Sequence, residues 1–442
     1  MKKSIIGAVV VVFFLCSYFQ TIFASEYTPL PGADLGANAS GEITAYVGKK
    51  GLTCPANYTN GDYLPNPYKD ETPLYRIDHS NVAKYESRLS RGQVARLKRN
   101  KNFYMNVYPT HRNFTFPQVV ADATAKNLKT AKIDKNNLLQ GFNGGVPFPT
   151  PKTGVQAAWN IKKYYNGDDV KAWSTRRVVS PTGRIKKDIQ YTQVINFDEN
   201  RLFSKIANPD QVFRKIISLY TYPADKAGTG ILNINYLDDH RLDATWLYIP
   251  TLRRVRRAPT LGGGAQIDGE STMDEIGTFY RGPVDDWNWK LLGKQELYIP
   301  DNAYGMWQVG TPDSEECLPG DINPKNLRYE LRRVWVVETT AIDGLDHPYS
   351  KRIFYADEDN WRITVGESYD RRGNLWRAVE FYTYLDYCQD YRVILSQIFL
   401  NLESGRYELI GGGLSEKTSA AIINTGFKDS DFTVQSLRRA GR

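Results

Sequence analysis

The sequence predicts an α+β fold, in which a few helices pack on the concave side of one large, curved antiparallel sheet. Runs with the apolar and polar alternation of strands follow one another through residues 170–410. Turn-forming residues join many of these runs directly. Repeated hairpins without intervening helices indicate antiparallel pairing rather than βαβ units. Helical periodicity is found mainly in residues 81–165.

The composition favours a sheet with a binding surface over metal or acid–base chemistry. Aromatic residues make up 13% of the 442 residues, whereas histidine and methionine occur four times each. Aromatic side chains are typical of strands and of interfaces. The formal net charge of +8 suits contact with an anionic membrane surface or lipid headgroup. The arginines do not follow the pattern of a recognition helix, so we expect no nucleic-acid partner.

Residues 1–24 predict a secretory signal peptide. Lys2 and Lys3 precede an apolar run from Ile5 to Phe19, and Ala24 suits the small residue before a cleavage site. The apolar run is short for a membrane span of about 20 residues, so we favour cleavage over an uncleaved anchor.

Cleavage would leave three cysteines in an oxidising compartment, which permits one disulfide. Cys54 and Cys317 both lie in loops that contain proline, so they are the preferred pair. Cys388 lies among aromatic residues, where we expect a small buried apolar side chain.

The rest of the chain predicts an arm and one domain. Residues 26–72 are rich in glycine, proline and asparagine and predict an extended N-terminal arm, followed by a single domain over 73–442. Three helices are expected early in that domain, over Asn81–Arg99 with Asn81 as the N-cap, over Pro117–Lys129, and from the N-cap Thr153 through Tyr165.

The strands expected after residue 170 are joined by recognisable turns. Pro181-Thr182-Gly183 and Asp357–Asn360 each predict a hairpin. After the second turn, Trp361, Ile363 and Val365 are expected on one face of a strand. The expected strands are Ala172–Ser180, Ile185–Phe197, Ile216–Tyr222, Gly230–Leu237, a strand from Ala244, Leu331–Thr339, Arg352–Ala356, Trp361–Val365, Trp376–Tyr384 and Arg392–Leu400.

The segment Trp246–Arg257 combines an aromatic strand with a cluster of charge. Trp246 and Tyr248 are predicted on one face, and Leu247 and Ile249 on the other. The arginines after this strand predict a cationic rim beside an apolar pocket, although an amphipathic strand with a solvated end gives the same pattern. The rim candidates are Arg253, Arg254, Arg256 and Arg257. The long loop Ala258–Gly282 comes next, a length typical of lids and binding segments.

Four segments carry a resemblance to a known family. The segment W-L-Y-x-P-x-L-R-R-V-R-R at Trp246–Arg257 resembles a signature of bacterial periplasmic proteins assigned to outer-membrane lipoprotein sorting, with the LolA/LolB-type fold. Within that group the chain is similar to a family of unknown function. Leu30–Ile43, Gly144–Pro149 and Tyr369–Arg377 match further motifs, although Thr44-Ala45-Tyr46 stands where the family usually has Pro-x-Trp. The resemblance implies a half-barrel sheet with a helix lid and a periplasmic location.

The expected site is a binding surface rather than a catalytic centre. Gly366–Asp370 lacks the second glycine of a nucleophile elbow, and the histidines show no metal-ligand spacing, so we expect no enzyme activity, metal or cofactor. Tryptophans are core residues by default, but under a loosely covered concave sheet they would line a cavity for acyl chains. The cavity candidates are Trp246, Tyr248, Trp287, Trp289, Trp335, Trp361 and Trp376.

Together these features predict a periplasmic carrier or chaperone for a lipid or lipidated protein. The resemblance implies an inner-membrane exporter of the resistance-nodulation type as a partner, with peripheral membrane contact. The alternative is an adaptor or structural protein of an envelope complex whose sheet is fully packed. A secreted hydrolase is a third class, which would need a cleft with paired carboxylates.

Overall fold

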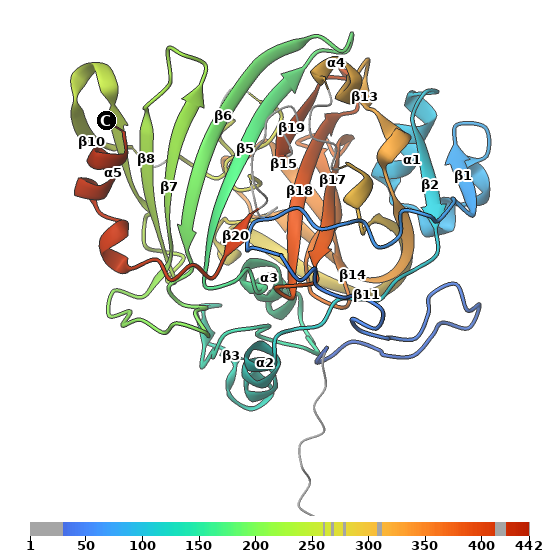
Figure 1. Cartoon of the computed structure of the whole chain (residues 1–442), viewed down its shortest axis with the longest axis horizontal. Helices are drawn as coiled ribbons and strands as arrows, with labels where there is room; N and C mark the ends of the chain where they lie inside the picture. Colours follow the sequence, from blue (N-terminus) through green and yellow to red (C-terminus); the bar gives the residue numbers. More distant parts are fainter. Residues whose placement is uncertain are drawn as a thin grey trace, which may run out of the picture.

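A single curved, open sheet organises the computed structural model, which describes residues 30–259, 261–266, 269–276, 280–306, 312–411 and 421–441. The signal segment predicted at 1–24 lies outside these residues. The sheet runs in the order β1-β2-β14-β15-β16-β17-β18-β19-β5-β6-β7-β8-β9-β10, with β11 also paired to β14 and β20 to β5. Figure 1 shows it curling from α1 on one side to α5 on the other. The expected α+β class with one large, curved and mostly antiparallel sheet is therefore confirmed.

The first half of the strand set lies before the long loop. These strands are β1 (Tyr75–Asp78), β2 (Tyr104–Tyr108), β3 (Lys132–Ile133), β4 (Leu139–Gln140), β5 (Asp169–Val179), β6 (Ile185–Asn196), β7 (Val212–Tyr222), β8 (Gly230–Tyr236), β9 (Ala244–Ile249) and β10 (Arg254–Ala258). From β5 onwards they form an antiparallel meander, as the alternating pattern predicted. β10 is the last strand of the sheet and therefore an edge strand.

The second half of the strands repeats the hairpin pattern, and it joins the first half where β19 pairs with β5. These strands are β11 (Trp287–Pro300), β12 (Cys317–Leu318), β13 (Asp321–Ile322), β14 (Tyr329–Ala341), β15 (Tyr349–Asp357), β16 (Ile363–Asp370), β17 (Leu375–Asp386), β18 (Tyr391–Asn401), β19 (Tyr407–Gly411) and β20 (Ile422–Ile423). β2 is an exception to the antiparallel rule, because it pairs in parallel with β14.

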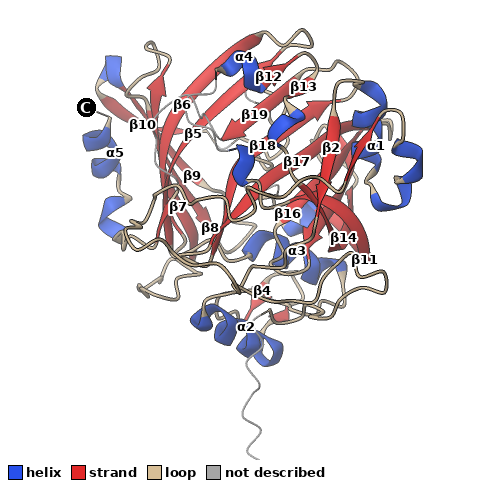
Figure 2. Ribbon diagram, turned by 45° about the vertical axis from the view of Figure 1, so that its right-hand side comes forward, coloured by secondary structure: helices blue, strands red, loops and turns tan. Residues whose placement is uncertain are grey.

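The helices pack on both faces of the sheet (Figure 2). α3 packs against β11 and β14, between the two halves of the sheet in Figure 1, whereas α5 packs on β8, β9 and β10 at its outer end. The helices are α1 (Arg91–Arg99), α2 (Gln118–Thr130), α3 (Gly154–Lys163), α4 (Asp313–Glu316) and α5 (Val434–Ala440). Among the described residues, no helix has the length and apolar character needed to cross a bilayer.

The helix expected over Asn81–Arg99 is shorter than predicted. Residues 82–88 form two 3₁₀ turns, and α1 begins only after Ser90, which makes a capping box with Gln93. The capping box makes Ser90 a stronger signal for a helix start than Asn81, whose side chain makes no capping hydrogen bond to the first 3₁₀ turn. Gly92 lets α1 approach the sheet, since a Cβ at this position would lie 3.1 Å from the Ala378 Cβ.

The strand after the Asp357–Asn360 turn differs from the prediction because of a β-bulge. The turn forms as expected, but Trp361 lies outside the strand with a φ of 62°. The pairing with β15 then skips Thr364. One extra residue shifts the alternation of the strand, so that the side chains after it point to the opposite face of the sheet. Ile363 therefore packs with Trp361 in the main core, whereas Val365 packs into a separate cluster on the other face.

The predicted disulfide pairing is wrong. Cys54 is bonded to Cys388, with a Cα–Cα distance of 5.2 Å, and Cys317 lies buried at the start of β12. The bridge ties the N-terminal arm to the turn between β17 and β18. Residues 30–72 contain no helix or strand, and the blue trace in Figure 1 crosses the sheet over these strands.

Candidate functional site

The signature strand places its two faces as predicted, but the aromatic face is covered. Trp246 and Tyr248 pack with Phe432 and with Leu437 of α5, and Tyr248 is 2% exposed. These two candidates therefore belong to a small core under α5. Leu247 and the other odd-numbered residues of β9 point to the opposite face of the sheet, which α5 does not cover.

The four predicted rim arginines lie together at the edge of the sheet. Arg253 ends a 3₁₀ turn in the left-handed conformation, and the other three lie on β10. All four are exposed, and Leu252 beside them is also exposed. We call Arg253, Arg254, Arg256 and Arg257 the arginine edge. On β10, the register places Arg254 opposite Ile249 and Arg256 opposite Leu247.

The remaining tryptophan candidates do not share one cavity. Trp287 lies against the ring of His347, and Trp289 stacks on Phe354. Midway along β14, Trp335 stacks on Trp361 at a centroid distance of 5.3 Å. Trp376 packs edge-on to Tyr349 and beneath the guanidinium of Arg377. Each ring is thus engaged by neighbouring side chains.

A segment of the predicted long loop fills one half of the sheet's inner face. We call residues 269–276 the inner strap, and we define the inner face as the face to which Arg352 and Arg377 point. Asp274 accepts hydrogen bonds from both terminal nitrogens of Arg352 at 3.0 and 2.8 Å, and Glu270 pairs with Arg377 at 3.0 Å. Glu408 of β19 accepts the backbone N–H groups of Glu270 and of the next residue at 2.8 and 2.7 Å.

The acidic residues of the strap have two kinds of partner, arginines and hydroxyl groups. Burial raises the pKa of Asp274, but the adjacent Arg352 guanidinium outweighs it and holds the pKa below its usual range. Glu275 accepts hydrogen bonds from Tyr349 and Thr272 at 3.0 and 2.8 Å. The strap therefore occupies space over β15–β19 that an open carrier cavity would need.

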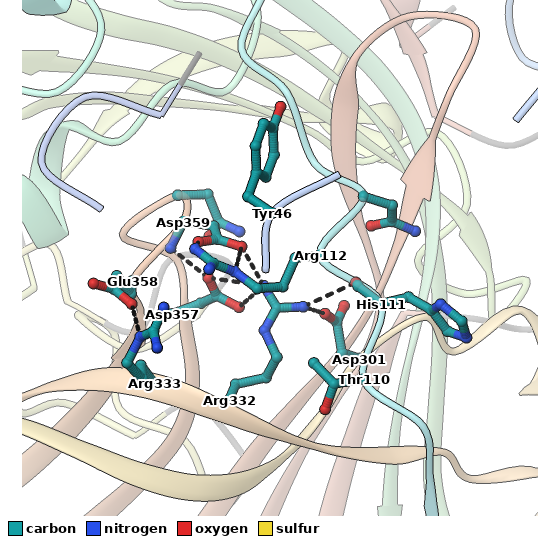
Figure 3. A network of polar contacts seen from close by, with 12 residues as sticks. Tyr46, Thr110, His111, Arg112, Asp301, Arg332, Arg333, Asp357, Glu358 and Asp359 are labelled. Atoms are coloured by element: carbon teal, nitrogen blue, oxygen red, sulfur yellow. Dashed lines mark hydrogen bonds and ion pairs between the residues drawn. The ribbon is translucent and has the colours of Figure 1, made fainter. Parts of the chain in front are cut away.

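A second buried network, shown in Figure 3, joins the hairpin turn at 357–360 to the chain before α2. Arg332 pairs with Asp301 and Asp359 at 2.7 Å each and with Asp357 at 3.0 Å, and Arg112 pairs with Asp359 at 2.5 Å. Burial is the main cause that raises the pKa of Asp357 to about 7, and the neighbouring Asp359 adds to it. From the sequence, Asp357 and Asp359 are expected only as residues of a hairpin turn. Their arginine partners lie up to 247 residues away.

These clusters offer little catalytic or metal chemistry. In the part of the chain that the structure describes, no group of three or more His, Cys, Asp or Glu side chains has the arrangement of a metal site. Most buried carboxylates of both networks are paired with arginines, whereas Glu275 accepts hydrogen bonds from hydroxyl groups. Ser368, from the weak hydrolase motif, is buried, and its hydroxyl lies 3.5 Å from Glu275. A small cavity of about 10 Å³ beside Phe114 and Tyr391 has room for roughly one water molecule.

The inner face over β6–β9 differs from the half under the strap. Its side chains are half-buried rather than buried, and they mix aromatic, aliphatic and small polar groups. Tyr191 and Tyr220 meet edge-on at 6.2 Å, and Gln193 hydrogen-bonds Ser218. α5 packs on the other face of these strands. We call this the open face; by register it consists of Tyr191, Gln193, Ile195, Ser218, Tyr220, Ile231, Asn233, Thr245, Leu247 and Ile249.

Comparison with known proteins identifies the family. A family model described as a protein of unknown function, DUF1329, matches residues 76–438. The chain belongs to the DUF1329 family. An uncharacterized protein of Pseudomonas aeruginosa is 36% identical to it over 426 residues, which is 94% of this chain and 92% of that protein. The family membership expected from the sequence motifs is confirmed.

The solved structures that match this chain include another DUF1329 protein. The structure of a DUF1329 family protein from Desulfovibrio piger covers 61% of this chain and 92% of its own, at 14% identity and a TM-score of 0.42. A putative outer membrane lipoprotein-sorting protein domain from Vibrio parahaemolyticus gives the same coverage and TM-score at 18% identity. A LolA superfamily protein from Nitrosomonas europaea matches 65% of this chain and 100% of its own, at 16% identity and a TM-score of 0.38.

Proposed function

We propose that this DUF1329 protein is a non-enzymatic carrier that holds a lipid or a lipidated protein against the open face. The observation that carries the proposal is the half-buried surface of β6–β9, which mixes aromatic, aliphatic and small polar side chains and whose other side is closed by α5. Burying each CH₂ group of an acyl chain against such a surface contributes about 0.8 kcal/mol. A chain of a dozen carbons would therefore bind usefully even when only part of it is covered.

The arginine edge would place this carrier on an anionic membrane. It adjoins the open face, since Leu247 and Ile249 pair directly with residues of β10. Each arginine near an anionic bilayer contributes about 1 kcal/mol of attraction. Cargo leaving the membrane would thus meet the open face next to the contact point.

The proposed location is the periplasm. The signal segment predicted in residues 1–24 would direct export, and the Cys54–Cys388 bridge is compatible with an oxidising compartment. A resistance-nodulation-type exporter is the proposed inner-membrane partner, with transfer towards the outer membrane or the export complex.

Native mass spectrometry tests the carrier proposal. Protein purified from the periplasm without detergent is expected to carry a mass consistent with lipid, and the delipidated protein is expected to take up palmitate from vesicles. The variant Leu247→Asp should reduce this uptake because it puts a charge on the open face. The control Asp343→Asn changes an exposed turn. Absence of lipid after purification, together with absence of uptake in vitro, would contradict the proposal.

One observation favours the second candidate, an adaptor in an envelope complex. The inner strap fills the half of the inner face over β15–β19 with ion pairs, as a fully packed sheet would. An adaptor would bind an envelope protein in a pull-down at equal strength whether or not the open face carries Leu247→Asp, and it would take up no lipid.

A further inference from the structure

Two arginines at one end of the open face, the buried Arg214 and the half-buried Arg281, lack the ion pairs that most buried arginines of the described residues form. Arg214 lies near the start of β7, is 3% exposed and points to the inner face directly opposite Asn235. Its Nε donates to the Asn235 Oδ1 at 2.8 Å, a neutral acceptor. Within the described residues the Arg214 guanidinium forms no ion pair. By contrast, Arg332 pairs with three aspartates.

Arg281 lies close enough to Arg214 for their charges to interact. It lies after the inner strap in the chain and donates one terminal N–H to the carbonyl of Met273. Its Nε is buried and has no hydrogen-bond partner in the described structure. A buried N–H group without an acceptor costs roughly 1–3 kcal/mol, and more when the group is charged.

The positive charges of Arg214 and Arg281 are only partly compensated by carboxylates. Burial, and after it the positive charge of Arg281, lowers the pKa of Arg214 to about 9. Burial likewise lowers the pKa of Arg281, and the Asp243 carboxylate counteracts this lowering for both arginines. Asp274 also acts on Arg281 but is already paired with Arg352, and the pKa of the shared Asp243 is itself raised by burial. Buried cations are stable when they are paired, so the arrangement is complete only with a further negative group.

The open face extends away from this pair. Ile216, Ser218 and Tyr220 come after Arg214 along the same face of β7, and six residues of strand span about 20 Å. An anionic head placed between the two arginines would leave a chain free to lie along these residues. Arginine donors match the planar oxygens of carboxylates and phosphates.

We propose that Arg214 and Arg281 bind the anionic head of an amphiphilic ligand, a carboxylate or a phosphate ester, whose apolar chain lies on the open face. This site rests on the proposed carrier function and names the class of its cargo. It differs from the arginine edge, which is exposed and lies at the far side of the open face on β10.

Equilibrium dialysis with three single-chain probes tests the site. Palmitate, hexadecyl phosphate and hexadecanol have chains of equal length but carboxylate, phosphate and neutral heads. The full chain should bind one or both of the charged probes at least about tenfold more tightly than hexadecanol, because hydrogen bonds to charged groups are the stronger ones. The order of palmitate and hexadecyl phosphate tells which head the site takes.

The variants Arg214→Gln and Arg281→Gln should each weaken binding of the preferred charged probe roughly tenfold to a hundredfold and leave hexadecanol unchanged. Arg372→Gln, in an exposed turn, is the matched control. Without ligand, neither glutamine variant should lower the Tm, because each removes the repulsion between the two guanidinium groups. A structural role would instead lower the Tm and weaken all three probes alike.

The two proposals fail in different ways. If palmitate, hexadecyl phosphate and hexadecanol bind equally and neither substitution changes their affinity, the anion site is wrong and the carrier function stands. If none of the three probes binds the full chain, the carrier function is wrong and the anion site with it.

Discussion

Removing the carboxylate of Asp274 should release the inner strap from the sheet. Asp274 accepts two hydrogen bonds from Arg352 and one from Thr272 at 2.7 Å, and the side chains of Asp274 and Arg352 are 3% and 0% exposed. Asp274→Asn leaves the Arg352 charge buried without this partner. Breaking a buried pair from one side costs about 3–5 kcal/mol, so we expect a loss of that size in the free energy of unfolding.

Urea unfolding and hydrogen exchange measure this loss. The variants Asp274→Asn, Arg352→Met and their combination form a double-mutant cycle, in which we expect a coupling energy of at least about 2 kcal/mol. The backbone amides of Ser271 and Thr272, which donate to the carboxylates of Glu408 and Glu275, should exchange faster in Asp274→Asn. The exposed Asp343→Asn is the control.

The same ion pair also sets a pH dependence. Because the folded pKa of Asp274 lies below its unfolded value of about 3.9, its contribution is present above that pH and is lost as the pH falls through the folded pKa. A change below about 0.5 kcal/mol for Asp274→Asn, or additive effects in the cycle, would refute the reasoning that ion pairs hold the strap.

Asp357, the disulfide, the arginine edge and Leu437 each give a further test. Because the pKa of Asp357 is raised, the folded state binds a proton at this carboxyl more tightly than the unfolded state, so stability should fall as the pH rises from about 4 to 7. Asp357→Asn should flatten that part of the plot of urea midpoint against pH. Parallel plots for the variant and the unchanged chain would contradict this. Non-reducing peptide mapping should find Cys54 joined to Cys388, and replacing both by serine should cost about 2–5 kcal/mol in unfolding experiments. Replacing the four residues of the arginine edge by glutamine should abolish salt-sensitive sedimentation with anionic vesicles and leave binding to zwitterionic vesicles unchanged. Leu437→Ala should destabilise the chain by about 2–5 kcal/mol, because Leu437 is fully buried, yet spare palmitate uptake; reduced uptake by the folded variant would place cargo under α5 instead.

Local pattern was enough to predict most of the sheet. Alternation and turn chemistry located the β5–β10 meander and the Asp357–Asn360 turn, because both depend on neighbours in the sequence. The same reasoning correctly separated Trp246 and Tyr248 from Leu247 and Ile249. It assigned the aromatic face to cargo, however, and no local signal showed that the distant helix α5 would cover it.

The errors arise where distant contacts or single-residue irregularities decide the structure. Cys54 and Cys388 are 334 residues apart, so their pairing depends on where the arm crosses the sheet. Thr364 is one extra residue opposite β15, and the alternation of apolar and polar residues in the sequence does not reveal such a bulge. The Arg214 and Arg281 pair joins two segments with no motif of their own. A lone buried arginine in a strand looks the same in sequence as a solvated one.

Photo-crosslinking with a diazirine derivative of palmitate tests the central claim most directly. After irradiation of the loaded full chain, peptide mass mapping should place the label on the open face, in peptides that contain Tyr191, Tyr220 or Leu247. Label confined to the residues around α5, or no label above that of the heat-denatured chain, would contradict the claim that this surface carries the cargo.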